Sequence, residues 1–294
     1  MYDFKQTCIL INKPSGISSN QTLNKIKKKL KQKKAGFSGT LDPMASGLLI
    51  IFLNKATKLC SYFSEADKKY EAVARLGKMS STGDGDGLIS NGNPIPKLNK
   101  TEMKMLEEKY TGKISQVPPM FSAVKYNGRR LYKYAREGIS VNRKPRTIEI
   151  FKIEIKKIDT KHLGINVWCS KGTYIRTLVE QIGEEIGCGA FLKKLVRTQI
   201  KDIDISSSVA LDDFLSLRNA EDVRKNTINV DRLLNNTYSY IASSQEKAHI
   251  LNGNKVKTDN KPCSNVKIYD QSEQFIGIGV INEQLELLPK KILI

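Results

Sequence analysis

An unbroken run of six apolar residues, LLIIFL at positions 48–53, most restricts how this chain can fold. The run is far too short to cross a bilayer, and a run of this length next to turn residues is typical of a buried strand. A loop with three glycines and one proline, positions 35–47, comes directly before it. We therefore expect a buried strand whose preceding loop is conformationally permissive.

Strand-like and helix-like periodicities alternate along the chain. Ser18 and Gln21 have the spacing of a capping box, which predicts a helix from about Ser19. Gly187 is in the position of a C-cap for a helix that follows Thr173. Other predicted elements are strands at 8–11, 70–76, 148–158 and 162–170, a short helix around 59–63, and a helical stretch at 211–224. Without regular β-α-β spacing, this pattern predicts an α+β fold with a mixed, largely antiparallel central sheet and flanking helices.

The last part of the chain has a different pattern. From about Tyr238 onward, short apolar segments alternate with turn sequences, which predicts a small β domain. We expect a main domain at residues 1–237 and a second domain at residues 238–294.

The net charge points to a polyanionic partner. Lys and Arg number 49 against 30 Asp and Glu, so the formal charge is +19. Nucleic acid explains such an excess better than a membrane surface, although a solubilising lysine-rich surface is the alternative. Seven lysines gather on and after the helix predicted from Ser19 and have no acidic partner four residues on, so this helix either faces phosphates or is simply solvated. They are Lys25, Lys27, Lys28, Lys29, Lys31, Lys33 and Lys34.

Cysteine and histidine usage excludes several classes of site. The five cysteines are scattered without a C-x-x-C pair, which favours a reducing cytoplasm and disfavours a disulfide framework or a zinc site. Only His162 and His249 occur, which disfavours histidine-based triads and metal sites. Residues 83–87 (GDGDG) lack the spacing of an EF-hand loop and are interpreted as a flexible loop. No targeting or membrane segment is recognised, so we expect a cytoplasmic protein.

A set of short motifs resembles the TruB family of tRNA pseudouridine-55 synthases. They occur in family order between residue 8 and about residue 200, and the central one is GTLDPMASG at 39–47. The others are KPSGISS at 13–19, KYEAVARLG at 69–77, QVPPMFSAVK at 116–125, CSKGTYIR at 169–176, and GCGA at 187–190 followed by Leu195 and Arg197. The C-terminal segment, from about Tyr238 onward, is similar, more weakly, to a PUA-type RNA-binding β-barrel.

The resemblance implies a tRNA-modifying isomerase that works on the T-arm without cofactor or metal, and we expect a monomer. Asp42 matches the family's catalytic carboxylate and Arg176 the arginine that pairs with it. Tyr70 matches a tyrosine that stacks on the target base and can transfer a proton, whereas Tyr174 and Leu195 match residues of the base pocket. Residues that match family substrate-binding positions are Lys13, Phe37, Tyr70, Tyr174 and Leu195.

Several simpler interpretations stay open. An Asp before a Pro in a loop is most often a turn residue, and Tyr70, Tyr174 and Leu195 could be ordinary core residues. Phe37 stands where most family members have His, which puts a polar role there in doubt. A non-catalytic tRNA-binding or tRNA-folding protein on the same scaffold is the main functional alternative, and a ribosome-associated structural protein is the second.

Overall fold

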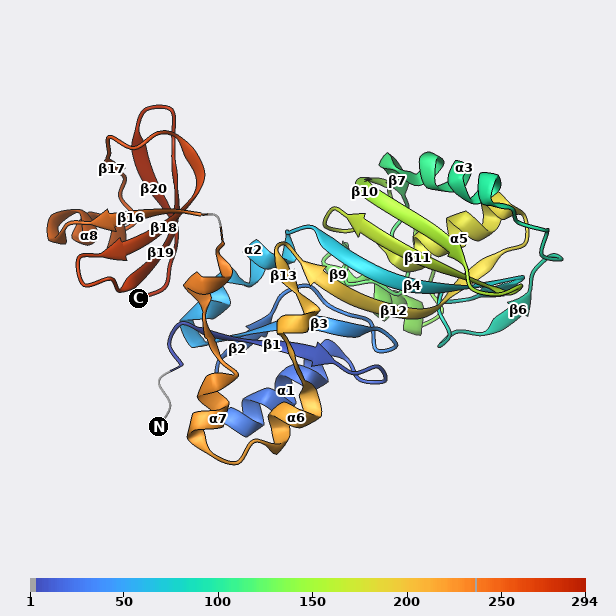
Figure 1. Ribbon diagram of the computed structural model, residues 1–294, viewed down its shortest axis with the longest axis horizontal. Helices are drawn as coiled ribbons and strands as arrows, with labels where there is room; N and C mark the ends of the chain where they lie inside the picture. Colours follow the sequence, from blue (N-terminus) through green and yellow to red (C-terminus); the bar gives the residue numbers. More distant parts are fainter. Residues whose placement is uncertain (1–3, 236) are drawn as a thin grey trace.

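A computed structural model describes residues 4–235 and 237–294 (Figure 1). Its largest element is a twisted sheet whose main path has the order β14-β1-β3-β12-β4-β11-β10-β7. Along this path the strands are Val209–Ala210, Thr7–Lys13, Ser46–Leu53, Ala190–Ile200, Lys68–Leu76, His162–Cys169, Arg146–Lys157 and Gly112–Gln116. Three short strands lie beside the path: β2 (Ala35–Phe37) on β3, β13 (Ile203–Asp204) on β12 and β15 (Ile228–Asn229) on β1.

The sheet is mixed and largely antiparallel, as predicted. On its main path, only β1 with β14 and β3 with β12 run parallel. Helices flank the sheet: α3 and α5 lie over the β10–β11–β4 region, while α1, α6 and α7 lie beside β1 (Figure 1). These helices are α1 (Ser19–Leu30), α3 (Lys100–Tyr110), α5 (Ile175–Ile186), α6 (Leu211–Ser216) and α7 (Ala220–Lys225). The chain therefore has the predicted α+β class.

The remaining elements of this part are short. They include the helices η1 (Asn54–Leu59), α2 (Cys60–Ser64), α4 (Leu131–Arg136), η2 (Ile205–Ser207) and η3 (Val230–Leu233). Two hairpins project from the sheet, one formed by β5 (Lys78–Ser80) with β6 (Ile89–Asn91), the other by β8 (Lys125–Tyr126) with β9 (Arg129–Arg130).

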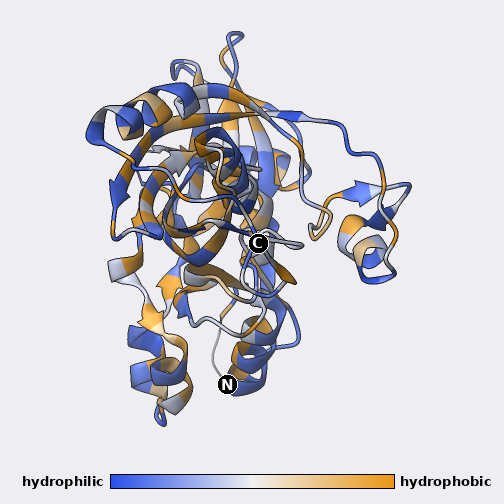
Figure 2. Ribbon diagram, turned by 90° about the vertical axis from the view of Figure 1, so that its right-hand side faces the viewer, coloured by the Kyte–Doolittle hydropathy of each residue, from blue (hydrophilic) through white to orange (hydrophobic). Residues whose placement is uncertain are grey.

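Strand β3 is the buried strand that the apolar run predicted. Every side chain from Leu48 to Leu53 is fully buried, because alternate residues contribute to two separate hydrophobic clusters. Leu48, Ile50 and Phe52 pack with Phe63, whereas Leu49, Ile51 and Leu53 pack with Ile26 of α1. Strands in the interior are coloured hydrophobic in Figure 2, and the outer turns of the helices are mostly hydrophilic.

Both predicted helix ends are confirmed. Ser18 caps α1 in a capping box in which its side chain accepts from the backbone of Gln21 and the Gln21 side chain accepts in return. Gly187 ends α5 at φ 84°, a left-handed conformation that favours glycine. The stretch predicted as helical at 211–224 is divided into α6 and α7, because Asn219 leaves the helix and caps α7.

The C-terminal segment forms a second, curled sheet of five strands. Its order is β16-β18-β19-β20-β17, and its own hydrophobic cluster includes Tyr240, Ile268 and Leu287. The elements are β16 (Tyr238–Ala242), α8 (Ser244–Leu251), β17 (Val256–Lys257), β18 (Cys263–Asp270), β19 (Phe275–Ile281) and β20 (Glu286–Ile292). We propose that the domain boundary lies between residues 237 and 238, where β16 begins.

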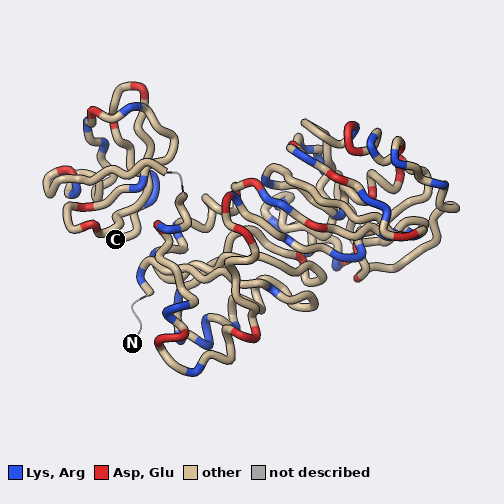
Figure 3. The backbone as a smooth tube through the Cα atoms, in the orientation of Figure 1, with Lys and Arg blue, Asp and Glu red and all other residues tan. Residues whose placement is uncertain are grey.

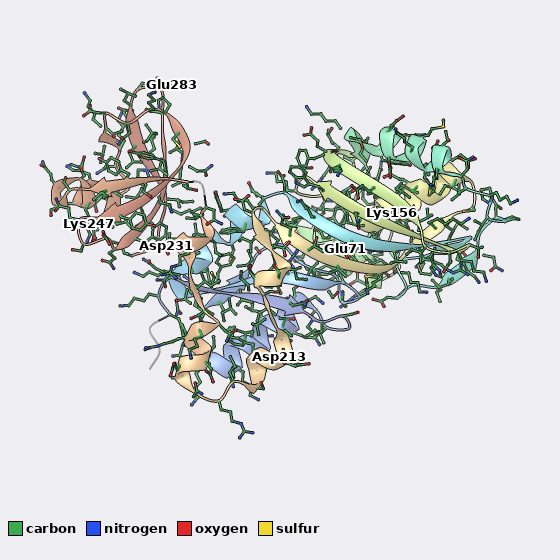
Figure 4. All side chains as sticks on the ribbon, in the orientation of Figure 1. Glu71, Lys156, Asp213, Asp231, Lys247 and Glu283 are labelled. Atoms are coloured by element: carbon green, nitrogen blue, oxygen red, sulfur yellow. The ribbon has the colours of Figure 1, made fainter. Side chains whose placement is uncertain are left out.

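The two sheets share an interface with an apolar centre. Phe275, Ile278 and Leu293 of the C-terminal segment are buried in the cluster that holds Leu10. At its edge the Tyr269 hydroxyl donates to a carboxylate oxygen of Asp231 at 3.0 Å, and Figure 4 labels Asp231 where the two parts meet. The second domain is therefore packed against the first and not merely tethered to it.

Positive and negative residues are spread over the whole molecule (Figure 3). Lysines lie on α1 and on the strands of the large sheet, and acidic residues are interspersed among them. Within the described residues, none of the helices combines the length and apolar character that a membrane crossing requires.

Candidate active site

The loop that carries Asp42 joins β2 to β3 and is held by hydrogen bonds at several points. The Ser19 hydroxyl donates to the carbonyl of Leu41 at 3.0 Å and accepts from the amide of the same residue at 2.9 Å. The amide of Gly16 donates to the carbonyl of Pro43 at 2.8 Å. These bonds tie the Asp42 loop to the KPSGISS segment, so the two motifs form one structural unit.

Gly47, near the start of β3, shows why the GTLDPMASG motif needs a glycine at its end. Its φ is 109°, and a Cβ atom there would lie 2.3 Å from the carbonyl oxygen of Arg197. A side chain at this position would therefore break the parallel contact between β3 and β12, in which Gly47 is the register partner of Arg197. That contact places the strand that follows Asp42 directly beside the strand that carries Leu195.

Asp42 forms an ion pair with Arg176, the second residue of α5. The Arg176 Nε lies 2.9 Å from Asp42 Oδ2, and the arginine is buried while the carboxylate is about one-third exposed. Two further bonds fix the guanidinium: Nη1 donates to the carbonyl of Thr82 at 2.8 Å and Nη2 to that of Phe121 at 2.7 Å. Three loops distant in sequence thus meet at one side chain.

A second carboxylate, Asp84, stands behind the same arginine. Its Oδ2 lies 3.6 Å from Arg176 Nη1, and its Oδ1 accepts from the Thr82 hydroxyl at 2.5 Å. The amide of Asp86 also donates to Asp84 Oδ1 at 3.1 Å. The 83–87 segment is a loop, as predicted, but the expectation of a merely flexible one is wrong, because a buried and hydrogen-bonded Asp84 anchors it.

The surroundings of Asp42 act on its ionisation in opposite directions. Burial raises the pKa of Asp42 above its ordinary value, the neighbouring Arg176 guanidinium lowers it, and the Asp84 carboxylate raises it. Arg176 therefore offsets part of the desolvation that would otherwise keep Asp42 protonated, and it holds the carboxylate in one orientation.

An inner cavity of about 250 Å³ opens beside this ion pair. It lies below the roughly 300–1,000 Å³ of typical ligand pockets, which suits a single base better than a whole nucleotide. Of the predicted site residues, Asp42, Tyr70, Tyr174, Leu195 and Arg176 all line it. The structure thus brings together, in one cavity, five side chains that come from four separate parts of the chain.

A wider groove of about 950 Å³ adjoins the inner cavity and shares Asp42 and Arg176 with it. Phe37 of β2 lines this groove, together with Tyr132 and the basic residues Arg130 and Arg136 from the α4 region. The Arg136 guanidinium lies 5.5 Å from the centre of the Tyr132 ring. A groove that presents aromatic rings and arginines and leads to a small inner cavity is suited to a nucleic-acid strand with one base turned inward.

Lys13 is the predicted site residue that the structure places elsewhere. It is fully buried and lines neither the inner cavity nor the groove. Its ammonium donates to the carbonyls of Ile17 at 2.7 Å, Pro14 at 2.8 Å and Pro43 at 3.5 Å. These contacts indicate that Lys13 positions the Asp42 loop, in place of the expected direct contact with the substrate.

Sequence reasoning did not single out Lys68 and Asp84 and gave Arg197 no role. Lys68 precedes Tyr70 by two residues and Arg197 follows Leu195 by two, so strand alternation alone could have placed both on the cavity side. Asp84 carried no such signal, because its contact with Arg176 depends on the folding of a glycine-rich loop. Among the described residues, no group of three or more His, Cys, Asp or Glu side chains is arranged to hold a metal ion.

Comparisons with known proteins agree with the motifs. The family description "TruB family pseudouridylate synthase (N terminal domain)" matches residues 27–175. "tRNA pseudouridylate synthase B C-terminal domain" matches 176–238, and "Pseudouridine synthase II TruB, C-terminal" matches 243–293.

Curated relatives cover almost the whole chain. A tRNA pseudouridine synthase B of Nitrosococcus oceani is 38% identical over 288 residues, which span 97% of this chain and 94% of the relative. A tRNA pseudouridine synthase B of Buchnera aphidicola is 39% identical over 295 residues, which span 97% of this chain and 94% of the relative.

Solved structures show the same fold. A chain in the crystal structure of a Cbf5-Nop10-Gar1 complex superposes with a TM-score of 0.75 at 23% identity, covering 99% of this chain and 86% of that chain. A chain in the structure of an H/ACA RNP bound to a substrate RNA containing 2′-deoxyuridine superposes with a TM-score of 0.73 at 21% identity, with 99% and 86% covered.

Proposed function

Because this chain belongs to the TruB family of pseudouridine synthases, we propose that it converts a uridine in the T-loop of tRNA, uridine-55, to pseudouridine. The curated relatives are tRNA pseudouridine synthases, and they match this chain over nearly its full length. We further propose that it acts as a monomer in the cytoplasm, without cofactor or metal.

The reaction is an isomerisation in which no atom is gained or lost. The N1–C1′ bond breaks, a C5–C1′ bond forms, the proton on C5 leaves, and N1 takes up a proton. A carboxylate near C1′, C2′ and C6 can assist by attacking C1′, adding to C6 or removing a proton from C2′. Asp42 is the proposed carboxylate for whichever of these three routes the enzyme follows.

The observation that carries the proposal is the position of the Asp42–Arg176 pair. It lies where the outer groove meets the small inner cavity, so a carboxylate stands at the entrance to a space that fits one base. A uridine stacked in a folded RNA must leave its stack to enter, at a cost of a few kcal/mol. Contacts of Arg130 and Arg136 with phosphates, and stacking of the base on Tyr70, are proposed to offset that cost.

The proposal is tested with a T-arm hairpin that carries tritium at C5 of its uridines. Conversion to pseudouridine releases the C5 proton, so we expect tritium to appear in water in proportion to product. A hairpin with cytidine at the target position is the matched control and should release none. Binding without release would instead support the non-catalytic tRNA-binding or tRNA-folding alternative.

A further inference from the structure

Two buried positive charges, Lys68 and Arg197, also line the inner cavity. Neither side chain forms an ion pair with any carboxylate in the described part of the chain, although Asp42, at the cavity entrance, is paired with Arg176. Burying an unpaired charge is costly, so proteins seldom do it without a use for the charge. The proposed function makes no use of this pair.

Arg197 is held rigidly beside the proposed stacking residue. Its Nε donates to the carbonyl of Leu48 at 2.8 Å and its Nη2 to that of Gly39 at 3.1 Å. Arg197 and Tyr70 are register partners on the adjacent strands β12 and β4, and both line the inner cavity. The guanidinium therefore lies next to the ring on which we propose the base stacks.

Lys68 retains donor capacity toward the cavity. It lies two residues before Tyr70 on β4 and is buried, and its ammonium donates to the carbonyls of Ser64, at 2.9 Å, and Ala66. An ammonium has three N–H groups, so one remains without an acceptor among the described residues. Burial, and then the nearby Arg197 guanidinium, lowers the pKa of Lys68 to about 8.

We infer that Lys68 and Arg197 form an electrostatic site that stabilises negative charge on the uracil ring when its bond to the sugar breaks. The inference rests on the proposed function and identifies residues that assist cleavage of the N1–C1′ bond. When N1–C1′ breaks, the electron pair stays on N1 and spreads to O2 and O4, so the detached ring is an anion. Fixed positive charges in a small cavity are well placed to lower the energy of that anion.

The ring must stay in the cavity after it detaches, because C5 has to form the new bond to C1′. An anion held by these two charges, with Asp42 at the entrance, can turn on the Tyr70 ring without escaping. The structural alternative is that Lys68 serves only to bind the carbonyls of Ser64, the last residue of α2, and of Ala66 just after it. The two roles predict different effects of changing the target base, because only the electrostatic role depends on how basic the departing ring is.

The test compares two T-arm RNAs that carry uridine or 5-fluorouridine at the target position. Fluorine withdraws electrons and makes the departing uracil anion less basic, so that anion needs less help from the protein. Single-turnover loss of the target nucleoside is followed by chromatography after nuclease digestion, for wild type, Lys68→Gln, Lys68→Met and Lys69→Gln. Lys69 is the matched control, because its ammonium lies outside the cavity, 5.4 Å from the centre of the Trp168 ring.

We expect Lys68→Gln and Lys68→Met to slow conversion of the uridine RNA about 100-fold, the scale seen when one fixed donor to a developing anion is removed. The same variants should lose about tenfold or less on the 5-fluorouridine RNA, and RNA affinity should change little. Lys69→Gln should match wild type on both RNAs. Lys68→Gln retains donors for the Ser64 and Ala66 carbonyls, so its melting temperature should stay near that of wild type even where Lys68→Met is destabilised.

Two results would overturn the inference. One is an equal rate loss on both RNAs, which would give Lys68 a purely structural role. The other is weaker RNA binding with an unchanged saturated rate, which would make Lys68 a binding residue. A wild-type protein that binds both RNAs and converts neither contradicts the proposed function itself.

Discussion

The Arg176 side chain joins Asp42 to two loops that are distant from it in sequence. Its Nε lies 2.9 Å from Asp42 Oδ2, while its two terminal nitrogens donate to the carbonyls of Thr82 and Phe121. Each nitrogen of the planar guanidinium therefore has its own partner, so the orientation of Asp42 depends on three segments at once. This arrangement leads to specific expectations for variants of the site.

Asp42→Asn should reduce the rate of tritium release by at least about 1,000-fold while RNA affinity stays within about threefold of wild type. An amide has nearly the same shape but can neither attack C1′ nor accept a proton from C2′. Asp213→Asn, an exposed change on α6 labelled in Figure 4, is the control and should be fully active. A rate within tenfold of wild type would remove Asp42 from its proposed role.

Arg176→Lys should lower the saturated rate strongly and RNA affinity only weakly, because a lysine cannot serve all three partners of the guanidinium. Arg176→Met should also move the acidic limb of the pH–rate profile upward. The reacting form of Asp42 is ionised, burial raises its pKa, and Arg176 lowers it, so losing the cation raises the pKa further. As the pH is lowered, the variant would then lose activity at a higher pH than wild type does.

The measurement is the pH–rate profile of wild type, Arg176→Lys and Arg176→Met under saturating RNA. Equal losses of rate and affinity, with an unmoved acidic limb, would indicate that Arg176 binds substrate and does not tune Asp42.

Phe37→His should be tolerated and Phe37→Ala should not. Phe37 lines the outer groove near Asp42 and packs against the apolar cluster that includes Ile51, so a flat ring fills space there. We expect His to retain the rate within about threefold and Ala to lose at least about tenfold. Melting temperatures measured in parallel show whether the Ala variant fails through a cavity in the core. An Ala variant with normal activity would make Phe37 peripheral.

Lys13→Met should lower thermal stability more than RNA affinity, because Lys13 binds loop carbonyls and does not face the groove. Burial, and then the nearby Arg197, lowers the pKa of Lys13 to about 8, against 10.5 for an ordinary lysine. Between these values the unfolded chain binds more protons than the folded one, so wild-type stability rises with pH there. The stability deficit of Lys13→Met should therefore widen from pH 8 to pH 10.

Urea unfolding at several pH values checks this expectation. A variant with normal stability and weakened RNA binding would restore Lys13 to the substrate-binding role that the motif resemblance implied.

Deleting residues 238–294 should weaken RNA binding and also lower the melting temperature of the remaining chain. The deleted segment carries lysines suited to binding phosphates, and it also buries Phe275, Ile278 and Leu293 in the cluster that holds Leu10. For every phosphate that the shortened chain no longer binds, the plot of log K against log salt should become shallower, its slope decreasing in magnitude by about 0.7 to 0.9. An unchanged melting temperature would show that the shared interface adds little stability.

Tyr269→Phe in the full chain is the matched control. It removes only the hydrogen bond to Asp231, so we expect a loss of about 1 kcal/mol in unfolding free energy and an unchanged salt slope.

Local structure could largely be predicted from the sequence by itself. The capping box of Ser18, the left-handed Gly187 and the buried run in β3 depend on neighbours a few residues away, so their signals are visible along the chain. The family motifs also predicted that Asp42, Tyr70 and Arg176 belong to one site, and the structure places all three around one cavity.

Only the tertiary structure decided which charges are buried and what they contact. The motif resemblance placed Lys13 among the substrate-binding residues, but its burial follows from the packing of the Asp42 loop on the chain before α1. Arg197 reaches Tyr70 through the register of β12 with β4, across more than a hundred residues of sequence. Such contacts depend on long-range strand pairing and loop closure, and no local pattern of residues encodes them.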